Sequence, residues 1–237
     1  MAKKGKLRAF ADKEPEERPK RFRKYKYLFL IVCEDENTER RYFEQFKVQI
    51  PEDTIYLEAV GTGKDPKGVV EMAIDEMKKL AEKSRKEVDV VWVVFDKDDA
   101  DLNEKRIQRF NDAFSIAASQ KNMKLAPSNE VFELWLLLHF TDVACDTVLP
   151  RQTVYQLLEK HIKTLRGYET FEYKHGNENV LEPVNTWGDQ PKAIERAKKL
   201  WIIQSQKPFI NANPCTLVYL LIEDLVAWIK YFSYKPD

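Results

Sequence analysis

Acidic side chains directly follow two apolar stretches of this chain. The stretch Tyr27–Cys33 is followed by Glu34, and the stretch Val88–Phe95 is followed by Asp96, with Asp98 two residues later. Mg²⁺ takes one or two carboxylates from a protein and completes its shell with waters and phosphate oxygens. Carboxylates crowded together without a cation raise one another's pKa by mutual repulsion. The three acidic residues therefore suggest a divalent-cation site.

The same acidic residues have a structural alternative. Aspartate is common after strands because it favours turns and caps helices. Asp98, Asp99 and Asp101 are all candidates to cap a helix that begins near Leu102. Glu39 is expected to favour a helix N-terminus through the helix dipole rather than to take part in chemistry. The joint arrangement, with acids after two separate apolar runs, is the more specific signal.

The elements that must position these acids alternate in type along the first 140 residues. The apolar stretches predict strands, and apolar residues at helical spacing predict helices between them. This alternation is typical of an α/β fold with a mainly parallel sheet, in which ligands gather at the carboxyl ends of the strands. The expected strands are 27–33, 54–60, 88–95 and 123–126, and the expected helices are about 38–48, 66–80, 103–120 and 132–140.

The second half of the chain shows a different pattern. After Pro150 we expect helices only, near 151–165, 190–206 and 214–232, and 167–188 has no clear periodicity. The predicted organisation is a basic, disordered arm at 1–25, an α/β domain at 26–145 and a mostly helical extension at 146–237 that packs on it.

The net charge of zero is a cancellation between two parts of the 237-residue chain. Residues 1–26 hold 11 Lys/Arg against 4 Asp/Glu, a charge of +7, and the remaining 28 against 35 give −7. A basic arm is either a solvated leader or a tail that contacts nucleic acid. An acidic body with clustered carboxylates has reason to bind cations.

Several classes of protein are disfavoured by the composition. No apolar stretch approaches the length of about 20 residues that spans a bilayer, so we expect no membrane association. The N-terminus lacks the apolar core of a signal peptide. Three cysteines and three histidines are scattered through the chain, which argues against disulfides and zinc and favours the cytoplasm. The segment Gly61–Lys64 does not complete a phosphate-binding P-loop, so we expect no ATP hydrolysis by this chain alone.

Four motifs carry a family resemblance. They read V-C-E-x-x-x-T-E at Val32–Glu39, F-D-K-D-D at Phe95–Asp99, S-N-x-x-F-E-L-W-L-L-L-H-F at Ser128–Phe140, and N-P-x-T at Asn213–Thr216. The first two resemble the Toprim domain of topoisomerases, bacterial primases and OLD-family nucleases. All four together resemble the RloB-like family of bacterial defence proteins, over about 27–228. Two departures are visible: Asp35 stands where the family often has glycine, and Glu130-Val131 stand where a Pro-Cys-like pair is more usual after Ser-Asn.

The resemblance implies a fold, an activity and a set of site residues. The fold would be a Toprim-like, Rossmann-type sheet, and the activity would be metal-dependent cleavage of DNA or RNA in anti-phage, abortive-infection defence. Asp96 and Asp98 would bind one or two Mg²⁺ or Mn²⁺ ions, Glu34 would ligate metal or handle a proton, and Glu133 would complete a metal site. An ATPase encoded alongside would be the partner. From the residues alone, Glu133 is a lone carboxylate on an apolar helix, and a buried carboxylate needs a partner.

Other residues are weaker candidates. Phosphodiester cleavage needs positive charge near the transition state, and Arg40, Lys64, Lys97 and Lys174 are candidates to bind nucleic acid, although solvated surface positions are the more common role for such residues. Aromatic residues of the later segment could stack on the bases of a single strand. His139 and Cys33 are expected to be core residues. The aromatic candidates are Tyr168, Phe171, Tyr173 and Trp187.

Three hypotheses follow from the sequence. The first is the metal-dependent nuclease. The second is a non-catalytic Toprim-like module that binds nucleic acid or a nucleotide and works through a partner ATPase. The third is a different Mg²⁺-dependent phosphotransferase, which lacks support because no nucleophilic-aspartate motif is present. Neither the oligomeric state nor the choice between DNA and RNA follows from the sequence.

Overall fold

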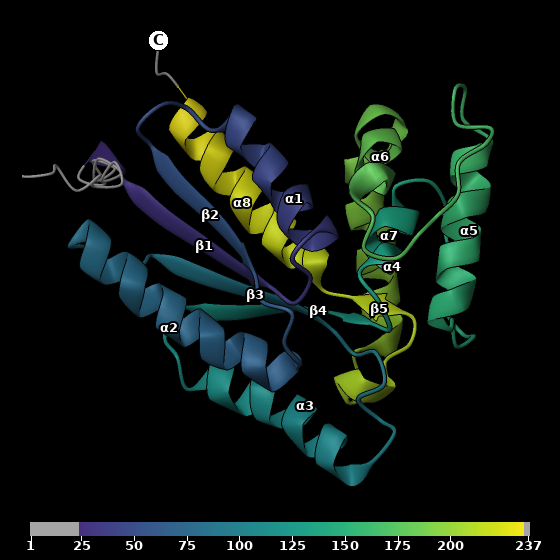
Figure 1. Cartoon of the computed structure of the whole chain (residues 1–237), viewed down its shortest axis with the longest axis horizontal. Helices are drawn as coiled ribbons and strands as arrows, with labels where there is room; N and C mark the ends of the chain where they lie inside the picture. The colour runs from purple at the N-terminus through teal and green to yellow at the C-terminus, as the bar shows by residue number, and fades with distance from the viewer. Residues whose placement is uncertain (1–23, 235–237) are drawn as a thin grey trace, which may run out of the picture.

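The structure is a computed structural model that describes residues 24–234. The arm predicted at 1–25 therefore lies, except for its last two residues, outside the described part. Five strands form one sheet in the order β2-β1-β3-β4-β5, and the first four are parallel (Figure 1). The expected fold class is confirmed: a mainly parallel, Rossmann-like sheet flanked by helices, with further helices toward the C-terminus. The strands are β1 (Tyr27–Cys33), β2 (Ile55–Gly61), β3 (Val90–Asp96), β4 (Met123–Asn129) and β5 (Cys215–Thr216).

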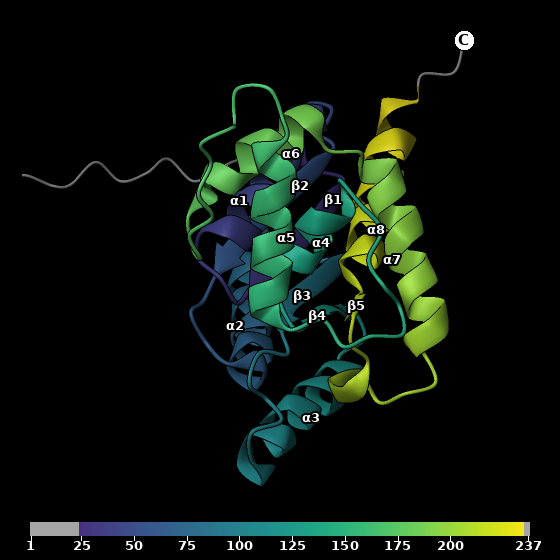
Figure 2. The same ribbon diagram turned by 90° about the vertical axis from the view of Figure 1, so that its right-hand side faces the viewer.

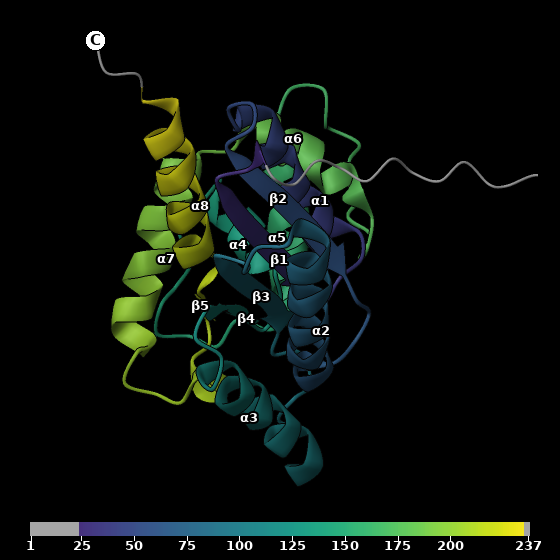
Figure 3. The ribbon, with the colours of Figure 1, turned by 90° about the vertical axis from the view of Figure 1, so that its left-hand side faces the viewer.

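The central strands are apolar on both faces because helices cover both sides of the sheet. Alternate residues of a strand point to opposite faces, so Phe29 and Ile31 join one hydrophobic cluster and Leu28 and Leu30 join another. One face carries α2 (Pro66–Ser84) and α3 (Glu104–Ala118), as Figure 3 shows. The opposite face carries the other helices, namely α1 (Thr38–Glu44), α4 (Glu133–Leu138), α5 (Arg151–Lys163), α6 (Leu181–Trp187), α7 (Gln190–Gln204) and α8 (Val218–Ser233).

The strand order creates a crevice at one edge of the sheet. The chain passes from β1 through α1 to β2 on one side, and then through α2 to β3 on the other side of β1. The chain leaves the carboxyl end of β1 toward α1 on one face and the carboxyl end of β3 toward α3 on the other, so the two connections diverge there. Such a switch point is where open parallel sheets bind ligands. Glu34 and Asp96 stand at these two strand ends.

Local capping explains where the helices of the α2–α3 layer begin. Asp65 accepts a hydrogen bond from the Gly68 backbone N–H, with Pro66 at the first helical position, and Asn103 accepts one from the Arg106 backbone N–H. Both are favoured N-terminal signals. The cap of α3 is therefore Asn103, and none of the three aspartates proposed as alternatives takes that place.

The expectation that only helices follow Pro150 is wrong at one point. Cys215 and Thr216, expected inside a helix from 214, instead form β5 and pair antiparallel with Asn129 and Ser128. The Ser128 and Thr216 hydroxyls lie 3.0 Å apart. This pairing joins segments far apart in sequence, which is why local periodicity did not predict it. The helix α8 begins only at Val218.

Smaller differences concern helix ends and one missed helix. The helix expected to reach residue 48 ends at Glu44 and continues as a 3₁₀ helix, Gln45–Gln49. The segment 167–188 contains the 3₁₀ helix Glu178–Val180 and then α6, whose periodicity is weak because it buries few residues. A further 3₁₀ helix lies at Phe209–Asn211.

Within residues 24–234, no helix is long and apolar enough to cross a membrane. The boundary predicted at 145 between an α/β domain and a helical extension remains a prediction. One hydrophobic cluster contains residues from both sides of it, among them Phe29 of β1 and Leu225 of α8.

Candidate active site at the switch point of the sheet

Glu34 connects the two strands at the switch point. Its backbone N–H donates to the Val94 carbonyl at 2.9 Å, which extends the pairing of β1 and β3 by one residue. Its side chain then turns along β3, where Oε2 accepts a hydrogen bond from the Asp96 backbone N–H at 3.0 Å. The Glu34 carboxylate is thereby held beside Asp96, as the two strand ends predicted.

Asp96 ends β3 and faces the start of α4. Its Oδ2 accepts a hydrogen bond from the Phe132 backbone N–H at 3.0 Å. Its Oδ1 is buried and has no hydrogen-bond partner. A buried carboxylate oxygen without a partner is costly. This oxygen is the strongest sign that Asp96 is shaped for a ligand that the described residues do not supply.

Glu39 joins the acidic group, although the sequence interpretation assigned it only a role at the helix terminus. It lies in the first turn of α1 and is only 2% exposed. Its Oε2 accepts a hydrogen bond from the Asp35 backbone N–H at 3.1 Å. The T-E pair of the first motif was the signal in the sequence that could have identified Glu39 as a site residue. In the structure, helix α1 directs this glutamate inward, toward Glu34 and Asp96.

Burial and mutual repulsion raise the pKa values of the acidic group. Burial raises the pKa of Glu34 to about 8, and the carboxylates of Asp98 and Asp65 add to the effect. The pKa of Asp96 lies well above its ordinary value because the group is buried beside Glu39, Asp98 and Glu34. Burial and the charge of Glu34 raise the pKa of Glu39 in the same way. Without a counter-charge, this group therefore holds protons at neutral pH.

Asp98 departs from the geometry of an extended strand. Its φ of 41° lies in the left-handed region, where aspartate is better tolerated than most residues, so the chain turns immediately after β3. Its backbone N–H donates to the Glu130 carbonyl at 3.0 Å. Burial raises the pKa of Asp98 and the nearby Arg151 opposes that rise.

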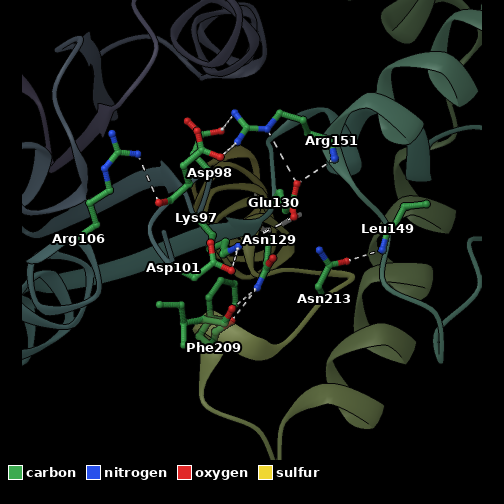
Figure 4. Close-up of polar contacts among 12 residues, drawn as sticks. Lys97, Asp98, Asp101, Arg106, Asn129, Glu130, Leu149, Arg151, Phe209 and Asn213 are labelled. Carbon is green, nitrogen blue, oxygen red and sulfur yellow. Dashed lines mark hydrogen bonds and ion pairs between the residues drawn. The ribbon is translucent and has the colours of Figure 1, made fainter. Parts of the chain in front are cut away.

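Arg151, the first residue of α5, supplies the cation nearest to Asp98. Figure 4 shows its guanidinium beside Asp98, with Nη1 3.3 Å from Oδ1 of Asp98, and the same guanidinium also forms an ion pair with Asp99. Its backbone N–H donates to Oε2 of Glu130 at 2.9 Å, which anchors the start of α5 to the turn after β4. No local pattern pointed to this residue, because 53 positions separate it from Asp98.

Glu133 lies behind the acidic group and has partners within the protein. It is 3% exposed in the first turn of α4. The Tyr173 hydroxyl donates to its Oε1, and Nδ1 of His175 lies 3.8 Å from the same oxygen. The hydrogen bond and charge of Glu133 raise the pKa of His175. The partner expected for this buried carboxylate is thus a tyrosine, with a histidine nearby, and its role as a metal ligand stays a prediction.

A pocket of about 860 Å³ opens in front of the acidic group. Glu34, Glu39, Asp96 and Asp98 line one part of it, and His175 lies at its edge. Basic side chains from the loop after β2 and from α3 also line it. The basic residues that line it are Lys64, Lys105, Arg106 and Arg109. Clustered carboxylates with basic side chains in the same pocket suit a phosphate ester that arrives with a divalent cation.

The four cations predicted to bind nucleic acid take different places. Lys64 is exposed and lines the pocket. Lys97 is only 5% exposed and forms an ion pair with Asp101 at 2.7 Å, so its charge is engaged inside the protein. Arg40 lies outside the pocket lining, 3.9 Å from Glu44 on the same helix. Lys174 is exposed in the loop next to His175.

His139 and Cys33 lie in the core, as expected. The ring nitrogens of His139 lie 3.0 Å from the Trp135 carbonyl and 3.4 Å from the Tyr42 hydroxyl. Burial lowers the pKa of His139 to about 4, so the ring is neutral. Cys33 is fully buried and its pKa is raised, which makes it an inert thiol.

The oxygen donors of this site fit a hard divalent cation in their chemistry. Glu34 and Asp96 are adjacent, one Asp96 oxygen lacks a partner, and burial beside other carboxylates raises the pKa of Asp96. Among residues 24–234, no three Asp, Glu, His or Cys side chains are grouped closely enough to hold one ion. One or two carboxylates with waters are enough for Mg²⁺. Glu34 and Asp96 are therefore the residues that would hold it, with Asp98 and Glu39 beside them.

The fold and the site together define a class: a Rossmann-like α/β protein with clustered carboxylates at the switch point of its sheet. A family model described as RloB-like protein matches residues 29–225. The chain belongs to the RloB-like protein family, as its four motifs predicted. Searches among curated proteins and among solved structures return no significant match.

Proposed function

We propose that this protein is a Mg²⁺- or Mn²⁺-dependent nuclease of Toprim type that cleaves phosphodiester bonds in DNA or RNA. One observation carries the proposal: the buried, unpartnered Oδ1 of Asp96, set among Glu34, Glu39 and Asp98 at the switch point. Basic side chains that line the same pocket, among them Lys64 and Arg106, supply cations for a polyanionic substrate. The Toprim resemblance of the first two motifs supports the same conclusion.

The protein residues would divide the work of the reaction. A bound divalent cation would supply charge neutralisation at the phosphate. Glu34 and Asp96 would hold that cation, and Lys64 and Arg106 would orient the backbone of the substrate. With its pKa raised to about 8, Glu34 is suited to accept or donate a proton near neutral pH. Arg151 would hold Asp98 in place.

The cellular role that we propose follows from the family. Membership in the RloB-like family supports a role in anti-phage defence by abortive infection, with an ATPase as partner. The three cysteines are free and two of them are buried, which suits the reducing cytoplasm.

A cleavage assay with Mn²⁺ or Mg²⁺ on single- and double-stranded DNA and RNA tests the nuclease. We expect Asp96→Asn and Asp98→Asn to lower the rate by at least about 100-fold, because each removes a charge from the cation site. Asp112→Asn is the matched control, since Asp112 pairs with Lys67 on the surface of α3. Full activity in Asp96→Asn contradicts the proposal.

A non-catalytic binding module is the second candidate. It is favoured by the lack of a three-ligand group among the described residues and by the protein partners of Glu133. Such a module would bind nucleic acid in the same pocket and signal through its partner ATPase. Tight binding of an oligonucleotide with Mn²⁺ present, without any cleavage, would select this function.

A further inference from the structure

A second pocket, of about 570 Å³, adjoins the acidic site along the outer face of α5. Gln152, Tyr155, Gln156, Lys160 and Lys163 line it from that helix. Their spacing of three or four positions places them on one face. In Figures 1 and 2, α5 lies on the outside of the molecule, and the segment that leads to α6 passes beside it.

The wall opposite α5 is aromatic. Tyr173 stacks on Tyr155 with ring centroids 4.9 Å apart and an interplanar angle of 28°, and the His175 ring lies 5.8 Å from Tyr155. A backbone hydrogen bond holds this wall in place, because the Tyr173 N–H donates to Oε2 of Glu159 at 2.9 Å. Both Tyr173 and His175 line the pocket.

The polar groups of this pocket are free to bind a ligand. Within residues 24–234, the side-chain amides of Gln152 and Gln156 and the ammonium of Lys160 have no hydrogen-bond or ion-pair partner. The charge of Glu159 is already engaged, since Lys163 contacts it at 2.6 Å. Stacking rings, two free amides and a free cation are what a nucleobase with its attached phosphate requires.

The two pockets share His175, which lies beside the buried Glu133. His175 lines both of them, and it lies 3.8 Å from Oε1 of Glu133 and 3.4 Å from the Tyr155 hydroxyl. Tyr173 contacts the same Glu133 oxygen through its hydroxyl. The aromatic pocket therefore adjoins the acidic pocket at His175, on the side where a strand bound at the acidic group could extend.

We propose that the pocket formed by Tyr155, Tyr173, Gln152 and Gln156 is a nucleobase subsite, and that the substrate is single-stranded nucleic acid. Bases inside a duplex are stacked on one another and do not offer their faces to a protein ring. Unpaired bases stack on aromatic side chains irrespective of sequence. This proposal rests on the proposed function only in placing the subsite next to a nuclease site. The aromatic and polar groups that would bind the base do not depend on nuclease activity.

Binding of short RNA and DNA strands that carry the fluorescent base 2-aminopurine tests this subsite. The Asp96→Asn protein is used, with Mg²⁺ present and the integrity of each strand checked on a gel. We expect quenching of the fluorophore as the base stacks, and weaker binding of the same sequence as a duplex. Tyr155→Leu should lower affinity by about 5- to 100-fold, the range for loss of one base-aromatic stack, and Tyr155→Phe should keep it.

A second variant separates loss of binding from loss of folding. Gln156 is exposed, so Gln156→Glu should leave the thermal unfolding temperature unchanged and still weaken strand binding through repulsion of the phosphates. Equal affinity of duplex and single strand, or unchanged affinity in both Tyr155→Leu and Gln156→Glu, overturns the subsite. If the wild-type enzyme also cleaves duplex, those results would contradict only the subsite, and the proposed nuclease function would still hold.

Discussion

The carboxyl group of Glu34 combines burial with a hydrogen bond that favours its charged form. Burial raises its pKa to about 8, and the Asp96 N–H that donates to Oε2 opposes this rise without cancelling it. Because neighbouring carboxylates add repulsion, the side chain is mostly protonated at pH 7 in the absence of a cation. A divalent cation would favour the charged form and expel the proton.

Proton release on metal binding follows from this pKa. We expect Mn²⁺ binding at pH 7 to release close to one proton from Glu34, beyond any that Asp96 and Glu39 release. Isothermal titration calorimetry in buffers of different ionisation enthalpy measures this number. Glu34→Gln, which keeps an oxygen for the Asp96 N–H, should release about one proton fewer. An equal release in both proteins contradicts the role assigned to Glu34.

The same shift links stability to pH in the metal-free protein. The unfolded chain titrates Glu34 near 4.5 and the folded chain near 8, so between these values the unfolded chain binds fewer protons. The contribution of Glu34 to stability is therefore full below pH 4.5 and falls as pH rises toward 8. Thermal unfolding with a chelator, for the wild type and for Glu34→Gln, measures it. A flatter pH dependence is expected for Glu34→Gln.

The Asp96 carboxylate is suited to bind a cation, and for the same reason we expect it to lower the stability of the metal-free protein. In Asp96→Asn the amide oxygen still accepts from Phe132, and the amide N–H₂ faces carboxylates where Oδ1 now lacks a partner. Because an unsatisfied buried polar group costs about 1–3 kcal/mol, we expect the metal-free variant to be more stable than the wild type by a similar amount at pH 8, with a higher unfolding temperature. Saturating Mn²⁺ should stabilise the wild type and not the variant. A less stable metal-free variant contradicts this account of the orphaned oxygen.

At the scale of elements, the end of β2 packs against the acidic turn that follows β1. Gly61, at the end of β2, lies so close to the acidic turn that an added Cβ would stand 2.3 Å from the Glu36 Cα. The Gly63 N–H also donates to the Glu34 carbonyl at 2.8 Å. The turn Glu34–Glu36 contains no glycine of its own. It is packed closely against Gly61 of the neighbouring strand β2 instead. The helix α5 then adds Arg151 from the opposite side.

Arg151 is expected to compete with a cation for the charge of Asp98. Arg151→Ala removes the guanidinium that contacts Asp98 and Asp99, so we expect Mn²⁺ to bind several-fold more tightly while the metal-free protein loses about 1 kcal/mol of stability. Arg41→Ala is the control, because it loses one charge and an ion pair with Glu178 outside the acidic pocket. Unchanged Mn²⁺ affinity in Arg151→Ala contradicts the expectation.

At the scale of the whole molecule, the sheet and the later helices share one core. The apolar residues of α4 are fully buried, and α5 and α7 pack against that helix. The strand β5 returns to pair with β4, and Asp224 of α8 accepts a hydrogen bond from the Trp92 indole of β3 at 2.9 Å. The acidic site and the aromatic subsite therefore belong to one packed unit within the described residues.

A fragment that ends at residue 145 tests this packing. We expect residues 24–145 alone to lack a cooperative unfolding transition and to aggregate, because the buried face of α4 and the free edge of β4 would be exposed. Circular dichroism and size-exclusion chromatography of the fragment, beside the full chain, give the comparison. A soluble fragment with a sharp thermal transition would contradict a shared core and would support the domain boundary predicted at 145.

Sequence alone predicted the features that depend on local pattern. The apolar runs located β1 and β3, their ends located Glu34 and Asp96, and the motifs predicted the RloB-like family. These predictions hold because a strand buried on both faces must be continuously apolar, and because parallel strands place their carboxyl ends at one edge of the sheet.

Tertiary structure alone decided the features that depend on contacts between distant segments. Glu39 turned from a helix-terminal residue into a member of the acidic group, Arg151 reached Asp98, and Tyr173 became the partner of Glu133. The strand β5 exists through its antiparallel pairing with β4, which is distant in the sequence. Each contact joins residues whose local surroundings are unremarkable, and burial, charge and hydrogen-bond partners arise only when the chain has folded.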